Sequence, residues 1–247
     1  MTDTDHPIDW NEYWTDADDA DYESATPSTH HLTGLVPALI DAKGTPETVA
    51  DVGCGPGVLT FDLSERYPDA TVVGYDTSDV ILEENRERAR LRGLENARFE
   101  RTTLPAFDPD RQFDLVCCYA TLCYVADTAD ALRALYDAVA PGGHLVLGYI
   151  TEAGRNHYHG RLEEPEAWRD RDPDFDPQGF ARRFRLVLEG ESTLSETQIE
   201  DALGTPPRQF WEFTEKPAER WAWDHVPLVW VPKEATTDDE NTPATHQ

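Results

Sequence analysis

Three glycines within five residues constrain this chain more than any other feature of its sequence. They lie in V-A-D-V-G-C-G-P-G, residues 49–57, directly after a run of apolar and small residues that is typical of a buried strand. Glycine weakens regular structure, so this cluster marks a place where the backbone bends sharply or approaches another group closely. A turn between a strand and the next helix lies at the carboxyl edge of a parallel sheet, where ligands bind. We therefore expect a nucleotide-like cofactor at this turn.

Strand-like and helix-like segments alternate from residue 48 to residue 150. Buried strands are expected at 48–53, 70–76, 97–101, 113–119 and 144–150. The helices between them are expected to end near Tyr67, at Gly93 and at P-G-G, residues 141–143. This order is typical of a doubly wound α/β fold with a mostly parallel sheet and helices on both faces.

No linker or internal repeat divides the chain, so we expect a single domain over residues 1–247. Its expected segments are an acidic N-terminal segment (1–27), a cofactor-binding core (28–150), a substrate-side insertion (151–190) that is irregular over residues 151–180, a C-terminal helix and hairpin (191–233) and a polar tail (234–247). The stretch R-F-R-L-V-L-E-G is expected to be extended. The hairpin is expected from two Trp-rich stretches, 210–215 and 221–231, and the helix from the capping box S-E-T-Q.

The acidic composition indicates the conditions in which the chain works. The formal net charge is −28, and only three of the 21 basic residues are Lys. Concentrated salt screens the self-repulsion of such a surface, since the Debye length is about 3 Å at 1 M. A disordered acidic protein is disfavoured by the seven Trp residues and by the periodic segments. We therefore expect a halophilic protein, and we do not expect it to bind nucleic-acid phosphates.

The sequence contains no targeting or membrane signal. No apolar segment follows Met1, and no run approaches the roughly 18 apolar residues of a membrane helix. The four Cys residues lack the C-x-x-C spacing of a zinc site, and two of them are adjacent, which is poor disulfide geometry. We expect a cytoplasmic protein with free thiols, no membrane association and no metal.

Two acidic residues narrow the expected cofactor. A dinucleotide fingerprint reads G-x-G-x-x-G and faces a pyrophosphate, whereas Gly53, Gly55 and Gly57 are spaced G-x-G-x-G. Asp51, two residues upstream, would repel a pyrophosphate but suits an ammonium or sulfonium group. Asp76, at the end of the second strand, can accept both hydroxyls of a ribose, as an acid in that place does in nicotinamide enzymes. A nicotinamide-dependent oxidoreductase therefore stays as an alternative.

At these residues the chain resembles the class I S-adenosylmethionine-dependent methyltransferases. The resemblance covers residues 45–150 and rests on D-V-G-C-G-P-G, on G-Y-D-T-S, on F-D-L-V-C-C-Y-A-T-L-C-Y-V-A-D and on P-G-G-H-L-V-L. It implies a Rossmann-like, seven-stranded sheet whose last strand is antiparallel. It also implies S-adenosyl-L-methionine as the cofactor and methyl transfer as the activity.

The resemblance further implies a set of cofactor-binding residues. In chain order they are Tyr13, Trp14, Asp51, Gly53, Cys54, Gly55, Gly57, Asp76, Thr77, Glu100, Thr102, Tyr119 and Ala120. The glycine turn would line the methionine and the ribose, with Asp51 near the amino group. Glu100, Thr102 or a backbone carbonyl would contact the adenine, and Tyr119, Ala120 and Thr121 would lie near the sulfonium and the substrate. The aromatic cluster W-N-E-Y-W, residues 10–14, would either cover the cofactor or serve as a docking surface. No catalytic residue is assigned.

The sequence favours a small molecule as the methyl acceptor. Methyltransferases that act on adenine or glutamine nitrogen carry D/N-P-P-Y/F after the fourth strand, where this chain reads C-Y-A-T, and the acidic surface disfavours RNA. Arg155, Arg161, Arg169 and Arg171 suggest an anionic acceptor such as a carboxylate, unless they pair with nearby Asp and Glu. A cofactor-binding protein without catalysis is a further alternative.

Overall fold

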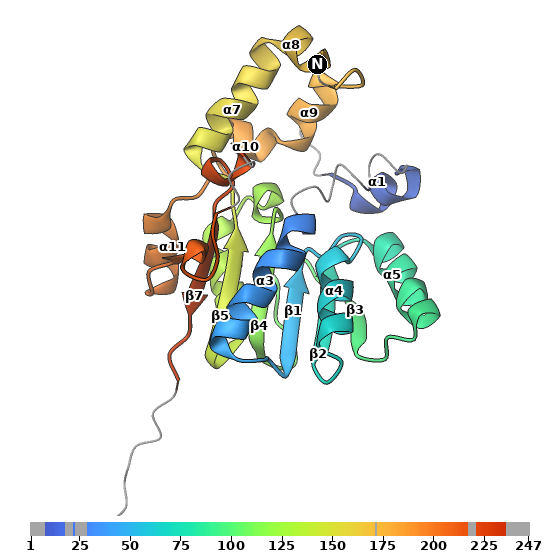
Figure 1. Cartoon of the computed structure of the whole chain (residues 1–247). Helices are drawn as coiled ribbons and strands as arrows, with labels where there is room; N and C mark the ends of the chain where they lie inside the picture. Colours follow the sequence, from blue (N-terminus) through green and yellow to red (C-terminus); the bar gives the residue numbers. More distant parts are fainter. Residues whose placement is uncertain (1–7, 18–21, 23–28, 171, 217–220, 236–247) are drawn as a thin grey trace, which may run out of the picture.

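A seven-stranded sheet forms the centre of the computed structural model, which describes residues 8–17, 22, 29–170, 172–216 and 221–235. The strands are β1 (Thr48–Val52), β2 (Thr71–Asp76), β3 (Ala97–Arg101), β4 (Phe113–Tyr119), β5 (Val139–Gly148), β6 (Arg208–Gln209) and β7 (Leu228–Pro232). Their order is β3-β2-β1-β4-β5-β7-β6, with β1 to β5 parallel and β7 antiparallel to both of its neighbours (Figure 1). This confirms the predicted Rossmann-like sheet with an antiparallel last strand.

Helices cover both faces of this sheet (Figure 1). Those on one face are α3 (Thr29–Lys43), α4 (Val58–Arg66) and α5 (Asp79–Arg92), and those on the other are α6 (Thr128–Asp137) and α11 (Glu196–Leu203). Val49 of β1 packs against α3 and α4, and the next residue, Ala50, packs against α6, as the period of two in a strand requires. Because β1, β2 and β4 are parallel, their carboxyl ends meet at one edge of the sheet.

A second group of helices lies beyond that carboxyl edge. It consists of α7 (Glu152–Glu163), α8 (Pro165–Arg169), α9 (Pro177–Arg183) and α10 (Arg185–Glu189), while α1 (Trp10–Asp16) lies between this group and α5 (Figure 1). Val187 of α10 packs with Ile150 and with Cys123 of the 3₁₀ helix η1 (Leu122–Tyr124), which joins the group to the ends of β4 and β5. No helix in the described part of the chain is long and apolar enough to cross a membrane.

The structure corrects the prediction that residues 151–180 are irregular, because most of them are helical. The polar and proline residues that suggested loops are helix starts. Thr151 caps α7 and Asp176 caps α9, each with a side-chain oxygen that accepts from backbone N–H groups. Pro165 and Pro177 occupy the first turns of α8 and α9, where a missing N–H removes no helical hydrogen bond.

Three further local predictions are wrong. Residues 183–190, predicted to be extended, contain α10. The P-G-G stretch, residues 141–143, does not end a helix but lies within β5, whose pairing with β4 shifts register nearby. Of the predicted hairpin, the segment 221–231 contributes to β7, but β7 pairs with β6, which lies just before the predicted segment 210–215. Phe210–Glu212 (η2) and Trp221–Asp224 (η3) are 3₁₀ helices. Short apolar runs do not distinguish strand from helix, so tertiary packing decided these segments.

Candidate functional site

The glycine turn connects β1 to α4 and is tied to the end of β2. Gly53, Gly55 and Gly57 have φ values of +80°, +47° and +73°, in the left-handed region that favours glycine. The N–H groups of Gly53 and Cys54 both donate to the carbonyl oxygen of Tyr75, at 2.7 and 2.9 Å. The three glycines are therefore required by the backbone of the turn.

The chain after β4 packs directly onto this turn. A Cβ atom on Gly53 would overlap the Oγ1 atom of Thr121, so only glycine allows the approach. Ala120 has φ +56°, a conformation that is uncommon for residues other than glycine. Tyr119, the last residue of β4, packs against Gly148 of β5 so closely that a Cβ there would overlap its ring. The structure thus brings Thr121, which directly follows Ala120, to the glycine turn, while the Tyr119 ring packs on β5.

Asp51 is a buried carboxylate at the carboxyl end of β1. Its Oδ2 atom accepts a hydrogen bond from the Thr60 hydroxyl at 2.7 Å. The pKa of Asp51 is raised to about 6, chiefly by burial and to a smaller extent by the nearby Asp76, against the hydrogen bonds from Thr60, which lower it. Within the described residues no cation pairs with Asp51. A buried carboxylate that lacks a cation fits a ligand with a positively charged group.

Asp76 holds the end of β2 and the glycine turn together. Its Oδ2 atom accepts from the N–H of Gly55 at 2.9 Å, and its Oδ1 atom accepts from the N–H of Ser78 at 3.0 Å. Burial raises the pKa of Asp76, although these backbone hydrogen bonds oppose the change. Thr77 follows directly, and the N–H of Thr102 donates to the Asp76 carbonyl at 2.9 Å. Thr77 and Thr102 therefore lie beside Asp76.

Glu100 and Cys54, two other residues predicted to bind the cofactor, have surroundings that differ from those of Asp51 and Asp76. Glu100 is exposed and pairs across the β2–β3 ladder with Tyr75, whose pKa is raised by burial and then by the Glu100 charge. The Cys54 side chain is buried with Phe61 and Leu82, away from solvent. Only the backbone of Cys54 is therefore available at the glycine turn. Thr102, which directly follows β3, lies nearer to Asp76 than Glu100 does.

Among the described residues, neither the cysteine thiols nor the side chains that could ligate a metal form a second functional site. All four cysteines are free and buried, as predicted. Burial raises the pKa of Cys117 well above its usual range, so this thiol stays protonated. Across the described ranges, no group of His, Cys, Asp and Glu could hold a metal ion.

The sequence analysis missed two residues of α5 that support the turn. The Nδ2 atom of Asn85 donates to the carbonyl of Gly55 at 2.7 Å, and Nη1 of Arg88 donates to the carbonyl of Pro56 at 2.7 Å. Asn85 is fully buried and falls at helical spacing with the apolar Leu82. A polar residue on the apolar side of a helix was the signal that could have identified it.

The aromatic cluster of residues 10–14 forms α1 and packs over the turn. Trp14 is buried, and its Cζ2 atom lies 3.6 Å from the position that a Cβ would take on Gly55. Tyr13 instead faces α9, and Trp10 packs edge-on against η1. The structure therefore brings Trp14 to the glycine turn, and Tyr13 to its border.

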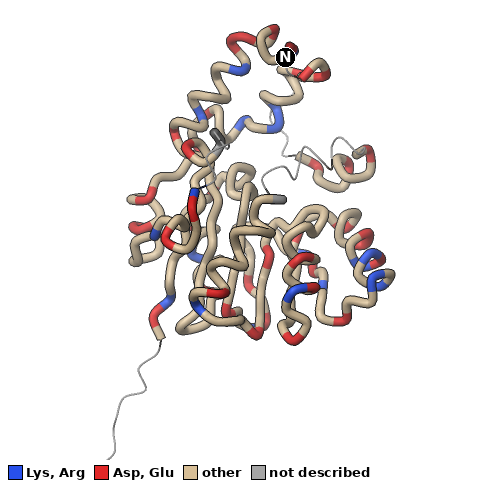
Figure 2. The backbone as a smooth tube through the Cα atoms, in the orientation of Figure 1, with Lys and Arg blue, Asp and Glu red and all other residues tan. Residues whose placement is uncertain are grey.

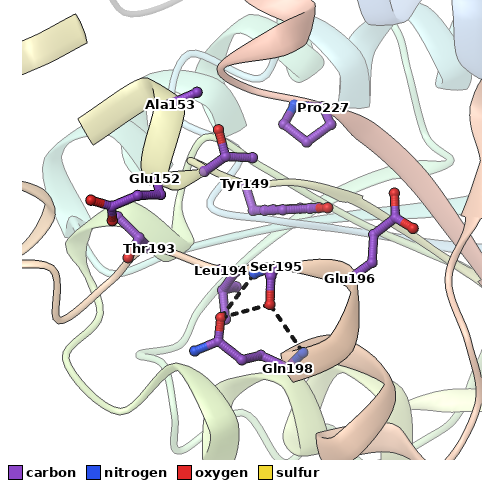
Figure 3. Close-up of a pocket in the computed structure, with 10 residues that line it drawn as sticks. Tyr149, Glu152, Ala153, Thr193, Leu194, Ser195, Glu196, Gln198 and Pro227 are labelled. Carbon is purple, nitrogen blue, oxygen red and sulfur yellow. Dashed lines mark hydrogen bonds between the residues drawn. The ribbon is translucent and has the colours of Figure 1, made fainter. Parts of the chain in front are cut away.

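A separate hollow of about 680 Å³ opens beside the carboxyl end of β5. Figure 3 shows Tyr149 across it, the capping box of Ser195 and Gln198 below, and Glu152 and Glu196 at its sides. None of the glycine-turn residues lines this hollow. It is acidic and distinct from the candidate site.

Comparisons with known proteins agree with this geometry. Residues 50–145 match the family described as methyltransferase domain. The chain is 34% identical over 167 residues to trans-aconitate 2-methyltransferase of Streptomyces coelicolor, an alignment that covers 66% of this chain and 54% of that protein. It is 41% identical over 141 residues to the trans-aconitate 2-methyltransferase of Variovorax paradoxus, covering 57% and 51%. The chain thus spans about half the length of these relatives.

Two solved structures are similar over nearly the whole chain. The plantazolicin methyltransferase in complex with a monoazolic desmethylPZN analog and SAH has a TM-score of 0.60 at 15% identity and covers 91% of this chain and 93% of its own. The N-methyltransferase NodS from Bradyrhizobium japonicum, in complex with S-adenosyl-L-homocysteine, has a TM-score of 0.51 at 14% identity, covering 90% and 92%. At such identities the likeness shows the fold alone. Residues 50–145 thus match a methyltransferase domain in sequence, and the chain as a whole shares the fold of these two methyltransferases.

Proposed function

We propose that this protein transfers a methyl group from S-adenosyl-L-methionine to a small-molecule acceptor. The observation that carries the proposal is Asp51, a buried carboxylate that no cation of the described residues pairs with, next to a glycine turn that Asp76 borders. A cationic cofactor with a ribose fits these two acids, and a pyrophosphate does not. The relatives named trans-aconitate 2-methyltransferase support an acceptor of low molecular weight.

The residues of this chain would hold the cofactor by charge and by backbone approach. Asp51 would pair with its ammonium group, Asp76 would accept from its ribose hydroxyls, and Gly53 and Gly55 would allow close contact. When bound, the cofactor supplies an activated methyl group on a sulfonium. Alignment of the two reactants can then supply roughly 7–11 kcal/mol of the barrier, so no general base is assigned.

The segments of the chain would divide the work between them. We propose a single domain in which residues 28–150 bind the cofactor and residues 151–190 cover the acceptor side. We also propose that the protein works in the cytoplasm of a salt-rich cell, since its net charge is −28. The same charge disfavours RNA as the acceptor.

Calorimetry with purified protein tests the proposed cofactor. In molar KCl, S-adenosylmethionine and S-adenosylhomocysteine should bind and raise the melting temperature by mass action, whereas NAD and NADP should do neither. Binding of NAD alone would favour the nicotinamide-dependent oxidoreductase. Binding of S-adenosylmethionine with no turnover across a broad panel of acceptors would favour a cofactor-binding protein without catalysis.

A further inference from the structure

Among the residues that the structure describes, no acidic side chain pairs with the guanidinium of Arg183, although the chain has 49 Asp and Glu against 21 Lys and Arg. Arg183 is half-buried at the end of α9. Its Nε atom donates to the Tyr124 hydroxyl at 3.2 Å and its Nη1 atom to the Tyr13 hydroxyl at 3.4 Å, with the Tyr13 ring 5.1 Å away. Burial raises the pKa of Tyr124, so this phenol stays neutral and supplies no negative charge to Arg183. The rings of Tyr124 and Phe184 also lie 6.0 and 5.5 Å from the guanidinium.

Two of the neighbouring arginines differ from Arg183 in this respect. Arg155 pairs with Glu152 at 3.0 Å and Arg169 pairs with Glu166 at 2.5 Å, so each has an acidic partner within the chain. Their partners are the nearby acids that the sequence analysis offered as the alternative. The other two arginines that the sequence analysis named are Arg161, whose guanidinium stacks on the Trp168 ring, and Arg171, which lies outside the described residues.

Within the described part of the chain, Arg183 is thus a half-buried cation with no acidic side chain beside it. Taking a charge out of water costs free energy unless an opposite charge or strong hydrogen bonds replace the lost solvation. Two neutral phenols satisfy only two of the five N–H bonds of the guanidinium. The remaining N–H groups suit a planar, bidentate anion, and carboxylate geometry matches this fork.

The position of Arg183 connects it to the candidate site. Tyr124 ends η1, three residues after Thr121, whose side chain meets Gly53 of the turn. Tyr13 precedes Trp14, which covers the turn from the other side. Arg183 therefore bridges the two segments that flank the glycine turn, and Figure 2 shows the basic end of α9 facing α1.

We propose that Arg183 is the anchor for a carboxylate group of the methyl acceptor, held in place by Tyr13 and Tyr124. This inference rests on the proposed function and adds the chemical class of the acceptor. The anchored carboxylate is a recognition group, and it places the rest of the acceptor over the turn at Gly53.

Acceptor binding to the complex with S-adenosylhomocysteine tests the proposal without turnover. The probes are trans-aconitate, citrate and succinate, with their full methyl esters as uncharged counterparts, titrated into the full chain in molar KCl. At least one free acid should bind, and its ester should not. Arg183→Met should weaken that binding by roughly one to two decades, because hydrogen bonds to charged groups are lost, and leave the S-adenosylhomocysteine affinity unchanged.

Arg182→Met is the matched control, since Arg182 is adjacent, exposed and only 3.9 Å from Asp176. It should leave acid binding unchanged, while Arg183→Lys should retain part of it. If Arg183→Met still binds S-adenosylhomocysteine and also binds the acid like wild type, or if no free acid binds to wild type, the carboxylate anchor is overturned and the proposed function stands. Failure of wild type to bind S-adenosylhomocysteine would overturn both.

Discussion

Asp51 and Asp76 lie at the carboxyl ends of the adjacent strands β1 and β2, and their carboxylates have different hydrogen-bond donors. Asp51 lies in the interior with the Thr60 hydroxyl as its side-chain donor, whereas Asp76 accepts from the backbone N–H groups of Gly55 and Ser78. Burial raises the pKa of both carboxyl groups. A carboxylate whose ionisation costs stability in the free protein is available to bind a cation. The effect of each acid on the stability of the free protein can therefore be measured separately from its effect on cofactor binding.

Replacing Asp51 by Asn should stabilise the unliganded protein near pH 7 and weaken cofactor binding. The folded-state pKa of about 6 lies above the usual 3.8, so ionisation of Asp51 costs stability as the pH rises from about 4 through about 6. Two pKa units correspond to about 3 kcal/mol, which is the largest gain expected for Asp51→Asn. Denaturant unfolding of both proteins at several pH values measures it. Equal stability is expected near pH 4, and a less stable Asn variant at pH 7 would contradict the argument.

Replacing Asp76 by Ala should weaken cofactor binding by about one to two decades, since charged hydrogen bonds are worth roughly 1.5–3 kcal/mol. Calorimetric titration with S-adenosylhomocysteine measures the loss. Asp79→Ala is the control, because Asp79 is exposed at the start of α5 and lies 3.6 Å from Arg101. Equal losses in the two variants would mean that Asp76 only caps the segment before α5.

Replacing Gly53 by Ala should cost more stability than replacing Gly93 by Ala. Both residues have positive φ values, +80° and +69°, so both substitutions carry a backbone cost of about 1–2 kcal/mol. A Cβ on Gly93 meets nothing within 4 Å, whereas one on Gly53 overlaps Thr121. We expect an additional 1–3 kcal/mol, roughly, for Gly53→Ala in denaturant unfolding. Thr121→Gly in the same chain should recover part of it, and equal costs at both glycines would show that the overlap relaxes freely.

At the scale of elements, α1 depends on the rest of the molecule. A seven-residue helix is marginal by itself, so its tertiary contacts stabilise it. Trp14 lies over Gly55, and the Asn11 side chain accepts from the Ser78 hydroxyl at 3.0 Å. These contacts join α1 to the glycine turn and to the segment between β2 and α5, where it can control access to the site.

Trp14→Ala should speed release of S-adenosylhomocysteine, because contact losses act mainly on dissociation rates. The change should lie on the order of tenfold, measured by stopped-flow displacement. Glu12→Ala, exposed on the same helix, is the control and should leave the rate unchanged. If Trp14→Ala keeps the release rate and instead lowers the unfolding free energy by the roughly 3–5 kcal/mol of a core Trp, α1 is part of the core rather than a cover.

At the scale of the whole molecule, acidic residues are spread over nearly all elements (Figure 2). With a net charge of −28, self-repulsion should destabilise the fold in dilute buffer. The melting temperature should therefore rise as KCl increases from about 0.1 M to about 1 M, where the Debye length falls from about 10 Å to about 3 Å. Sucrose is the control for solute effects without screening. A melting temperature that does not change with KCl would contradict the expected adaptation to salt.

By itself the sequence determined the sheet and the turn at its edge. Apolar runs at 48–53 and 113–119, the spacing of Gly53 to Gly57 and the acid at Asp76 are local signals, and local signals can be read without knowing the fold. The helix caps at Thr151 and Asp176 are not distinguished from loops by the sequence, because Thr and Asp are common both at helix starts and in turns.

Only the tertiary structure decided which side chains surround the turn. Asn85 and Trp14 meet Gly55 from elements that lie 30 or more residues away in the chain, and no sequence period records such contacts. The same holds for Arg183. In the sequence it resembles Arg155 and other arginines of residues 151–190, and it differs from Arg155 only because folding gives Arg155 an acid and Arg183 two phenols. The partners of a charged side chain depend on contacts between distant segments of the chain, and only the packing of the folded protein determines those contacts.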